Sequence, residues 1–455
     1  SGSKGLIGYT GSPGTGGGGG NDFINLYLGS TSRSYVSKMS DIISVKDYGA
    51  KGDGVTNDYS AVMQAIAAAQ TVTSLSPAEY KKPAATIYFP AGIYNIGSPI
   101  NVNADCIGFK GAGKNATLIR QTFSNGNLFN ISKGDTQTIN YIVMSDFGIS
   151  ATTNITSGAF IYLLNSHNCD FQNIQISGWG GINIGVQIDG GATWPAPYQP
   201  YTNKFTWVQI DGPGASTGLA GFAIGQQGYP QDTWIDNCEI NGINIGVYYV
   251  CGGGLQVMRT ECLNNRVGLI IGPTAGKECI WTWLHMFQVD TGTENGIQIL
   301  PVGGNIKVVN MSTCWSSSMG FNGLLIDQAS RGGTISEITI TGSTFLTNNY
   351  NGISTNGNID GLLISDNAII NNSVAGSSQY HGVYIGPYAS RVNIHGNHIG
   401  SMANQTNNQK YGVFIDNNVD KLIIQNNIMD QNQTSGLQDA GGTNKPNIIS
   451  GVNAN

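Results

Sequence analysis

All seven tryptophans and four of the six glutamates fall within residues 179–315, less than a third of the 455-residue chain. Indole rings present flat apolar surfaces on which the C–H faces of sugars can stack, and carboxylates can act as general acids and bases. Single tryptophans could instead pack beneath long loops such as residues 192–201, but the cluster as a whole indicates a carbohydrate-binding surface. The tryptophans are Trp179, Trp194, Trp207, Trp234, Trp281, Trp283 and Trp315.

Glu239 and Glu261 are the leading candidates for catalysis. We align the repeated segments of the chain on the inward-facing Cys238 and Cys262, and strand alternation then turns both glutamates outward. In this alignment Glu261 occupies a position that neighbouring repeats fill with asparagine, and the two backbones lie roughly 8 Å apart. A separation of ~6.5–9.5 Å leaves room for a water molecule and favours an inverting hydrolase. The alternative, that Glu261 only hydrogen-bonds a turn, stays open.

Other polar residues near the tryptophans have lesser predicted roles. Asp236 is expected to orient a catalytic neighbour, while Asp211, Asp232 and Asp290 rank lower because aspartates at turns are usually structural. Arg259 could bind an acidic sugar or serve in a surface ion pair. His285, between Trp283 and Phe287, could be a base or a structural hydrogen-bonding group. The predicted substrate-binding residues are Trp207, Trp234, Trp281, Trp283, Trp315, Arg259 and His285.

The composition excludes several classes of protein. With 21 basic against 27 acidic residues, the chain is not expected to bind nucleic acid. No run of apolar residues approaches the length needed to span a bilayer, so no membrane insertion is expected. The seven cysteines form no closely spaced pair and are expected to be small buried hydrophobes rather than disulfides or zinc ligands. No metal and no organic cofactor is implied.

The elements that must position these residues follow from an internal repeat. A glycine followed by Ile, Leu or Val recurs at steps of 26 to 30 residues, and each unit holds two or three short strands between Gly and Asn turns. This pattern predicts an all-β fold, a parallel β-helix with one turn per repeat and inward residues stacked in columns. Asparagines at its tight turns are expected to hydrogen-bond their copies one turn away. The repeat glycines are Gly242, Gly268, Gly296, Gly323, Gly352, Gly382 and Gly412.

One helix is predicted ahead of the repeats, where it would cap the open end of the β-helix. Asn57 or Asp58 is expected to cap the N-terminus of this helix, and residues 85–96 read as two strands joined by a turn. The apolar face of the helix comprises Ala61, Val62, Ala65, Ile66 and Ala69.

Four segments are expected along the chain. Glycine at every third position in residues 1–20 fits either a short collagen-like helix of three chains or a disordered linker. We predict a neck over residues 21–41, the β-helix catalytic domain over residues 42–435 and a C-terminal tail over residues 436–455.

Three stretches carry a resemblance to a known family. Residues 43–54 (ISVKDYGAKGDG), the following TND with its alanine-rich helix, and residues 86–96 (TIYFPAGIYNI) resemble the N-terminal motif of the pectate-lyase-like right-handed β-helix superfamily. With its GYTGSPG lead-in, the chain most resembles bacteriophage tailspike depolymerases of that superfamily. The resemblance implies a homotrimer on the phage tail, joined through an N-terminal anchor that has been removed, which binds and cuts a bacterial capsule or O-antigen.

The superfamily's catalytic motifs do not carry over to this chain. Polygalacturonase-like enzymes have an Asp-Asp pair, Gly-His-Gly and Arg-Ile-Lys, whereas Tyr380-His381-Gly382 stands here without such flanks. We therefore expect an endo-acting glycoside hydrolase that uses paired carboxylates. The alternatives are a lyase acting on a uronate-containing glycan, with His285 or a tyrosine as base and Arg259 binding the uronate, and an adhesin that binds glycan without cutting it.

Overall fold

The computed structural model describes residues 42–74, 85–178, 184–191, 202–329, 331–376, 378–402 and 408–440, with the backbone of strand residues 22–23, 33–34 and 448–449. The predicted collagen-like segment, most of the predicted neck and tail, Trp179, Trp194 and loop 192–201 lie outside the described residues. The segment boundaries at residues 20, 41 and 435 therefore remain predictions. No helix in the described ranges is long and apolar enough to cross a membrane.

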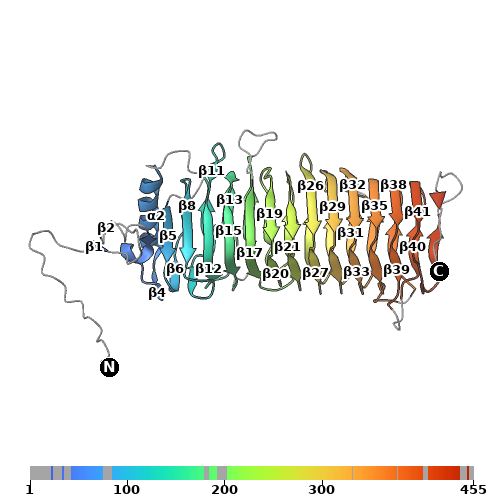
Figure 1. The fold of residues 1–455 in the computed structure, drawn as a ribbon, viewed down its shortest axis with the longest axis horizontal. Helices are drawn as coiled ribbons and strands as arrows, with labels where there is room; N and C mark the ends of the chain where they lie inside the picture. Colours follow the sequence, from blue (N-terminus) through green and yellow to red (C-terminus); the bar gives the residue numbers. More distant parts are fainter. Residues whose placement is uncertain are drawn as a thin grey trace, which may run out of the picture.

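The chain forms a rod-shaped parallel β-solenoid, with α2 (Tyr59–Ser74) covering one end (Figure 1). One wall is a 13-stranded sheet, and each of its strands pairs in parallel with the strand one rung away. These strands are β7 (Ile100–Val102), β10 (Phe129–Ile131), β13 (Ala159–Leu164), β16 (Ile184–Asp189), β18 (Ala220–Ile224), β21 (Ile245–Tyr249), β25 (Val267–Ile271), β28 (Ile297–Ile299), β31 (Leu324–Asp327), β34 (Ile353–Asn356), β37 (Val383–Ile385), β40 (Tyr411–Ile415) and β42 (Ser435–Asp439).

The opposite wall, here called the bent sheet, has a corner in the middle of each rung. Some rungs cross this corner as one long strand and others as two short strands. The strands used below are β8 (Ile107–Gly111), β9 (Thr117–Gln121), β12 (Val143–Ala151), β15 (Asp170–Ile176), β17 (Asn203–Asp211), β19 (Thr233–Asp236), β20 (Glu239–Asn241), β23 (Gln256–Met258), β24 (Glu261–Leu263), β26 (Glu278–His285), β27 (Gln288–Asp290), β29 (Asn305–Ser312) and β30 (Trp315–Ser317).

The predicted parallel β-helix with one capping helix is confirmed. The predicted apolar face of the helix, from Ala61 to Ala69, is buried against the first rungs. Asn57 caps the helix by accepting a hydrogen bond from Tyr59 N (3.2 Å). The buried Asp58 carboxylate instead accepts bonds from Lys51 N (2.7 Å) and Gly52 N (3.1 Å), so it fixes the preceding turn. The predicted strands over residues 85–96 are β5 (Ala85–Phe89) and β6 (Gly92–Ile96).

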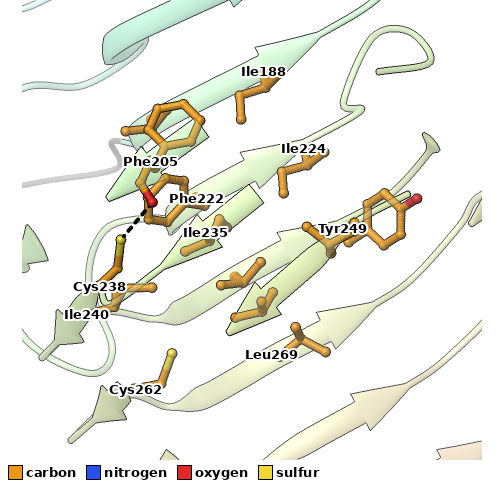
Figure 2. Close-up of a cluster of buried hydrophobic side chains, with 14 of the residues drawn as sticks. Ile188, Phe205, Phe222, Ile224, Ile235, Cys238, Ile240, Tyr249, Cys262 and Leu269 are labelled. Atoms are coloured by element: carbon orange, nitrogen blue, oxygen red, sulfur yellow. Dashed lines mark hydrogen bonds between the residues drawn. The ribbon is translucent and has the colours of Figure 1, made fainter. Parts of the chain in front are cut away.

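The interior is one continuous column of apolar side chains, crossed by ladders of buried asparagine. Figure 2 shows part of the apolar column, in which Phe205 and Cys238 face the same interior. In one ladder Asn367 Nδ2 donates to Asn397 Oδ1 (2.9 Å), and Asn397 Nδ2 donates to Asn427 Oδ1 (2.9 Å). The asparagines thus bond their copies one rung away, as the repeat predicts, and satisfy each other's buried amides.

The repeat glycines allow neighbouring rungs to approach closely. A Cβ on Gly296 would lie 2.7 Å from the carbonyl oxygen of Gly323, and a Cβ on Gly323 would lie 2.7 Å from that of Gly352. The same column contains Gly246, Gly221 and Gly185 on the preceding rungs, whereas the predicted Gly242 lies outside it, in a turn with φ of +63°.

The strands of the 13-stranded sheet carry little charge. They contain three charged residues, Asp189, Asp327 and Asp439, and no lysine or arginine. A second apolar cluster lies on the outward face of this sheet, where Tyr248 and Ile270 border a hollow of about 300 Å³ that Arg266 and Arg331, from outside the strands, also line. By contrast, the strands of the bent sheet include many acidic and basic residues. The two walls therefore present chemically different surfaces to the surroundings.

Candidate active site

A groove of about 570 Å³ lies along the corner of the bent sheet, over strands β15 to β24. Four of the residues predicted for the site, Trp207, Glu239, Arg259 and Glu261, line it together. The full lining is Lys114, Asn173, Trp207, Val208, Gln209, Asn237, Cys238, Glu239, Arg259 and Glu261.

The corner residues of four consecutive rungs form one side of this groove. Asn173, Trp207, Asn237 and Arg259 all have φ between +47° and +57°, the left-handed conformation. Asparagine tolerates this conformation, but a tryptophan or an arginine adopts it at a cost of roughly 1–2 kcal/mol. The Trp207 side chain is 63% exposed, so burial does not offset that cost. The corner residues of the next two rungs, Met286 and Thr313, are also left-handed, so the turn of the solenoid imposes this conformation whatever the residue.

Glu239 and Glu261 are directly opposite each other on neighbouring strands, in a parallel ladder without a bulge. The predicted alignment was therefore wrong by two residues, since Cys262 pairs with Ile240 and not with Cys238. Both cysteines face the interior, as Figure 2 shows, so a two-residue slip preserves the inward and outward alternation. The glutamate backbones are one rung apart, about 4.8 Å, instead of the predicted 8 Å.

The two glutamates belong to a column of outward polar residues, not to an asparagine column. Register pairing places Gln209 before Glu239 and Gln288 after Glu261, and Trp315 follows Gln288. The prediction that Glu261 replaces a turn asparagine is thus wrong. The residue at that corner position is Arg259.

The carboxylates of Glu239 and Glu261 are unusual in having no partner. Within the described residues, the other three glutamates all form ion pairs, whereas these two form neither ion pairs nor side-chain hydrogen bonds. Like charges directly opposite in a sheet are destabilising. Neither packing nor charge pairing therefore accounts for their presence in the groove. The paired glutamates are Glu278 with Lys307 (2.9 Å), Glu294 with Arg266 (2.6 Å) and Glu337 with Arg391 (2.6 Å).

Asp236 and Arg259 form an ion pair through two hydrogen bonds at the groove. Arg259 Nε donates to Asp236 Oδ1 (2.9 Å), and a second bond joins Nη2 to Oδ2. These bonds to the carboxylate raise the pKa of Arg259 above its already high usual value. Asp236 therefore fixes the position of Arg259 through Nε and Nη2, and the other N–H groups of the guanidinium do not bond to Asp236.

The lower-ranked aspartates have hydrogen-bond partners or a buried setting. Asp211 accepts bonds from Gln209 Nε2 (3.1 Å) and Gln175 Nε2 (3.3 Å), and Asp290 accepts one from Ser317 Oγ (3.1 Å). Burial raises the pKa of Asp232.

The other predicted tryptophans surround the groove without lining it. Trp281 and Trp283 are 50% and 39% exposed on β26, and Trp315 is half-buried two rungs beyond Glu261. Trp234 is half-buried, with Lys204 Nζ 4.4 Å from the centre of its ring. All four belong to strands of the bent sheet, and their role in binding stays a prediction.

His285 lies outside the groove. It is in register with Met258, and a hydrogen bond joins its Nδ1 to Ser312 Oγ (2.9 Å) on the next rung. This contact fits the structural alternative for His285 better than a role as a base beside Arg259.

Lys114 is the groove residue that sequence reasoning missed. It lies in the loop between β8 and β9, and its carbonyl oxygen is 2.8 Å from where a Cβ on Gly148 would be. Lys114 forms no ion pair in the described part of the chain, so its ammonium group is available to a ligand. Its sequence context, Gly-Lys-Asn in a turn, contains no repeat signal that would place it beside Trp207. No group of three or more metal-ligating side chains is found among the described residues.

Comparison with known proteins gives a family match. Residues 42–270 match the model of a family described as rhamnogalacturonase A/epimerase, pectate lyase-like. No curated protein sequence matches this chain.

Solved structures with a similar fold include two phage proteins and a glucanase. The pre-mature gene product 12 of bacteriophage phi29 is 17% identical, with a TM-score of 0.62 over 90% of this chain and 57% of that one. Tailspike protein 3 of bacteriophage CBA120 is 13% identical, with a TM-score of 0.59 over 93% and 63% of the two chains. The catalytic unit of the α-1,3-glucanase from Streptomyces thermodiastaticus is 14% identical, with a TM-score of 0.54 over 90% and 69%. At these identities the likeness establishes the fold.

Proposed function

This chain belongs to the rhamnogalacturonase A/epimerase, pectate lyase-like family, and we propose that it is a phage tailspike depolymerase that hydrolyses a bacterial capsule or O-antigen. The phage proteins of similar fold support the tailspike assignment. The glucanase of similar fold supports hydrolysis of a polysaccharide. The protein would act at the host cell surface as part of the virion.

The observation that carries the proposal is the pair of unpartnered carboxylates in the groove. Glu239 and Glu261 lie beside the exposed ring of Trp207, where a sugar can stack while a carboxylic acid and a carboxylate reach the same glycosidic bond. We assign catalysis to these two glutamates. Trp207 is assigned to substrate binding, and Asp236 is a positioning residue that acts through Arg259.

Lys114 and Arg259 extend the proposed binding site in opposite directions along the solenoid. Lys114 comes from the loop before β9, five rungs before Glu261, whereas Arg259 is on the same rung as Glu261. A glycan lying along the corner would therefore pass Lys114, Trp207 and the glutamates in turn. Trp283 and Trp315 are placed to contact its continuation beyond Glu261.

The test is incubation with a panel of purified capsules and O-antigens, followed by mass spectrometry of the products. We expect saturated oligosaccharides from one polysaccharide of the panel, and at least a hundredfold lower turnover by Glu239→Gln and Glu261→Gln. The matched control is Glu294→Gln, because Glu294 pairs with Arg266 outside the groove. Unsaturated, ultraviolet-absorbing products would indicate a lyase instead. Binding without any loss of polymer length would indicate an adhesin.

We also propose that three chains associate as a parallel homotrimer through the outward face of the 13-stranded sheet. That face is about 58 Å long, from twelve intervals of about 4.8 Å. Its strands carry an apolar cluster and little charge, and the core of an oligomer interface is likewise poor in charge. Light scattering should give three times the 48.0 kDa of one chain. A mass of one chain in dilute buffer would contradict the trimer.

A further inference from the structure

We infer that two aspartates outside the groove, Asp146 and Asp211, are positioning residues for substrate recognition. Each holds the side-chain amide of a groove residue, Asn173 or Gln209, so that the carbonyl oxygen is left to accept a hydrogen bond from the glycan. The inference rests on the proposed function and names what the site recognises, a glycan whose hydroxyl groups at these two places are free and not esterified.

The first of these amides belongs to Gln209, which lines the groove one rung before Glu239 and in register with it. Its Nε2 donates to Asp211 Oδ2 (3.1 Å), and Gln175 Nε2 donates to the same oxygen (3.3 Å). An ionised carboxylate has only acceptors, so the NH2 group of Gln209 must face Asp211 and the carbonyl oxygen is left to the groove. A residue outside the lining therefore sets the orientation of this amide.

The same arrangement occurs a second time, at the corner of the bent sheet. Asn173 lines the groove, and its Nδ2 donates to Asp146 Oδ1 (2.8 Å), one rung away and outside the lining. The other oxygen of Asp146 accepts a hydrogen bond from Ser145 Oγ (3.1 Å). Within the described residues, neither Asn173 Oδ1 nor Gln209 Oε1 accepts a hydrogen bond. Two amides from different strands thus offer the same kind of atom to a ligand.

These carbonyl oxygens extend the row of acceptors that the two glutamates supply. Gln209, Glu239 and Glu261 follow one another in register, so a ligand meets carbonyl or carboxylate oxygens on three successive rungs. A sugar hydroxyl can donate to such oxygens, whereas an acetylated hydroxyl has no proton to donate. A site built to bond a hydroxyl rejects an analogue that lacks it. Because Asn173 and Gln209 are half-exposed, we expect this rejection to be about tenfold.

The test exchanges the amide and the carboxylate within one pair. In Asp211→Asn the introduced amide can donate to Gln209, whose own amide then turns and presents NH2 to the glycan. We expect KM to rise about 3- to 10-fold with kcat unchanged, which is the loss of one hydrogen bond made equally to substrate and transition state. Gln209→Glu places two carboxylates together and should raise KM similarly. In the double variant, the introduced amide donates to the introduced carboxylate and still accepts from Gln175, so KM should return close to the wild-type value.

Asp290→Asn is the matched control. Asp290 is on the same outward column as Asp211, three rungs later, but it accepts from Ser317, whose hydroxyl can rotate to suit an amide. Its KM should therefore stay at the wild-type value. The inference would be overturned by an unchanged KM in Asp211→Asn, by a fall in kcat alone, by a double variant no better than the single ones, or by an equal rise of KM in the control.

A second readout uses the polysaccharide that the wild type cuts, before and after chemical O-acetylation. We expect the wild type to cut the acetylated polymer about tenfold more slowly. Asp211→Asn and Asp146→Asn should narrow this ratio, because an outward NH2 group can donate to an ester carbonyl. An unchanged ratio would contradict the inference.

Failure of the proposed function is seen separately, as an absence of cleavage by the wild type. If the wild type binds a polysaccharide without cutting it, the Kd from calorimetry takes the place of KM in the same set of variants, and the same outcomes decide. If the wild type neither binds nor cuts any polysaccharide, the proposed function and the inference are both removed.

Discussion

Glu239→Gln and Glu261→Gln should each make the protein more stable while removing its activity. The two carboxylates face each other across one rung and have no cationic partner among the described residues. Two unit charges ~4.8 Å apart repel by about 0.9 kcal/mol in water and by about 3.5 kcal/mol at the effective dielectric constant near a protein surface. Because both side chains are half-exposed, we expect each variant to gain about 1 kcal/mol.

The gain has a signature that general stabilisation does not share. Repulsion is a property of the pair, so the double variant should be no more stable than either single one. In 1 M salt the Debye length falls to about 3 Å, and most of the gain should disappear. Turnover should meanwhile fall at least a hundredfold, or about 2.7 kcal/mol in activation free energy.

The free energy of unfolding is measured by urea denaturation at pH 8, in low and in high salt, for the wild type, the two single variants and the double variant. Glu294→Gln is the matched control, because it removes an ion pair with Arg266 and should not stabilise. Single variants that are less stable than the wild type would show that the carboxylates have favourable contacts. Gains that add up in the double variant would show that the two groups do not interact, and the one-rung geometry would then be refuted.

Three further predictions test the groove and the solenoid. Trp207→Asn places at the corner the residue found there as Asn173 and Asn237, so it should raise stability by about 1 kcal/mol and weaken glycan binding about 2- to 10-fold by calorimetry. Burial against Tyr384, Tyr411 and Phe414 lowers the pKa of His381 to about 4, so the neutral ring stabilises the fold above pH ~6.5 and this contribution is lost as pH falls toward 4. We expect a loss of about 1–2 kcal/mol for this part-exposed ring, and His381→Phe should reduce that pH dependence in urea titrations. Asn397→Ala should cost about 3 kcal/mol, because it removes the acceptor of the buried backbone N–H of Asn367 and one acceptor of the Asn367 side chain, whereas the exposed Asn417→Ala should cost little.

The sequence was sufficient for the fold because the solenoid repeats its own pattern. Glycine and asparagine recur once per rung, and the Ala61–Ala69 face marks the only segment with helical spacing among the described residues. The exclusion of the tryptophans from the core was also predictable, since the narrow interior of a β-helix has little room for indole rings. Trp207, Glu239, Arg259 and Glu261 accordingly meet in one groove.

Two aspects of the site could not be predicted from the sequence, each for a physical reason. The pairing of Glu239 with Glu261 could not be predicted because β20 and β24 are short. Cys238 and Cys262 both point inward, so an alignment shifted by two residues gives the same alternation of inward and outward side chains. Lys114 was missed because it comes from a loop several rungs before the glutamates. The spacing of residues near it in the sequence does not indicate a contact with a groove formed by later rungs.

The alternation of inward and outward columns has a consequence for how such a chain can change over generations. Residues such as Ile240 and Cys262 hold the rungs together, while their immediate neighbours Glu239 and Glu261 touch only what lies outside. Substitutions on the outer columns are therefore nearly free of penalty to folding, and each one alters a single position along the groove. A lineage can replace its recognition surface rung by rung under selection while inheriting the same rod, and descendants would come to share shape long after their specificities have diverged.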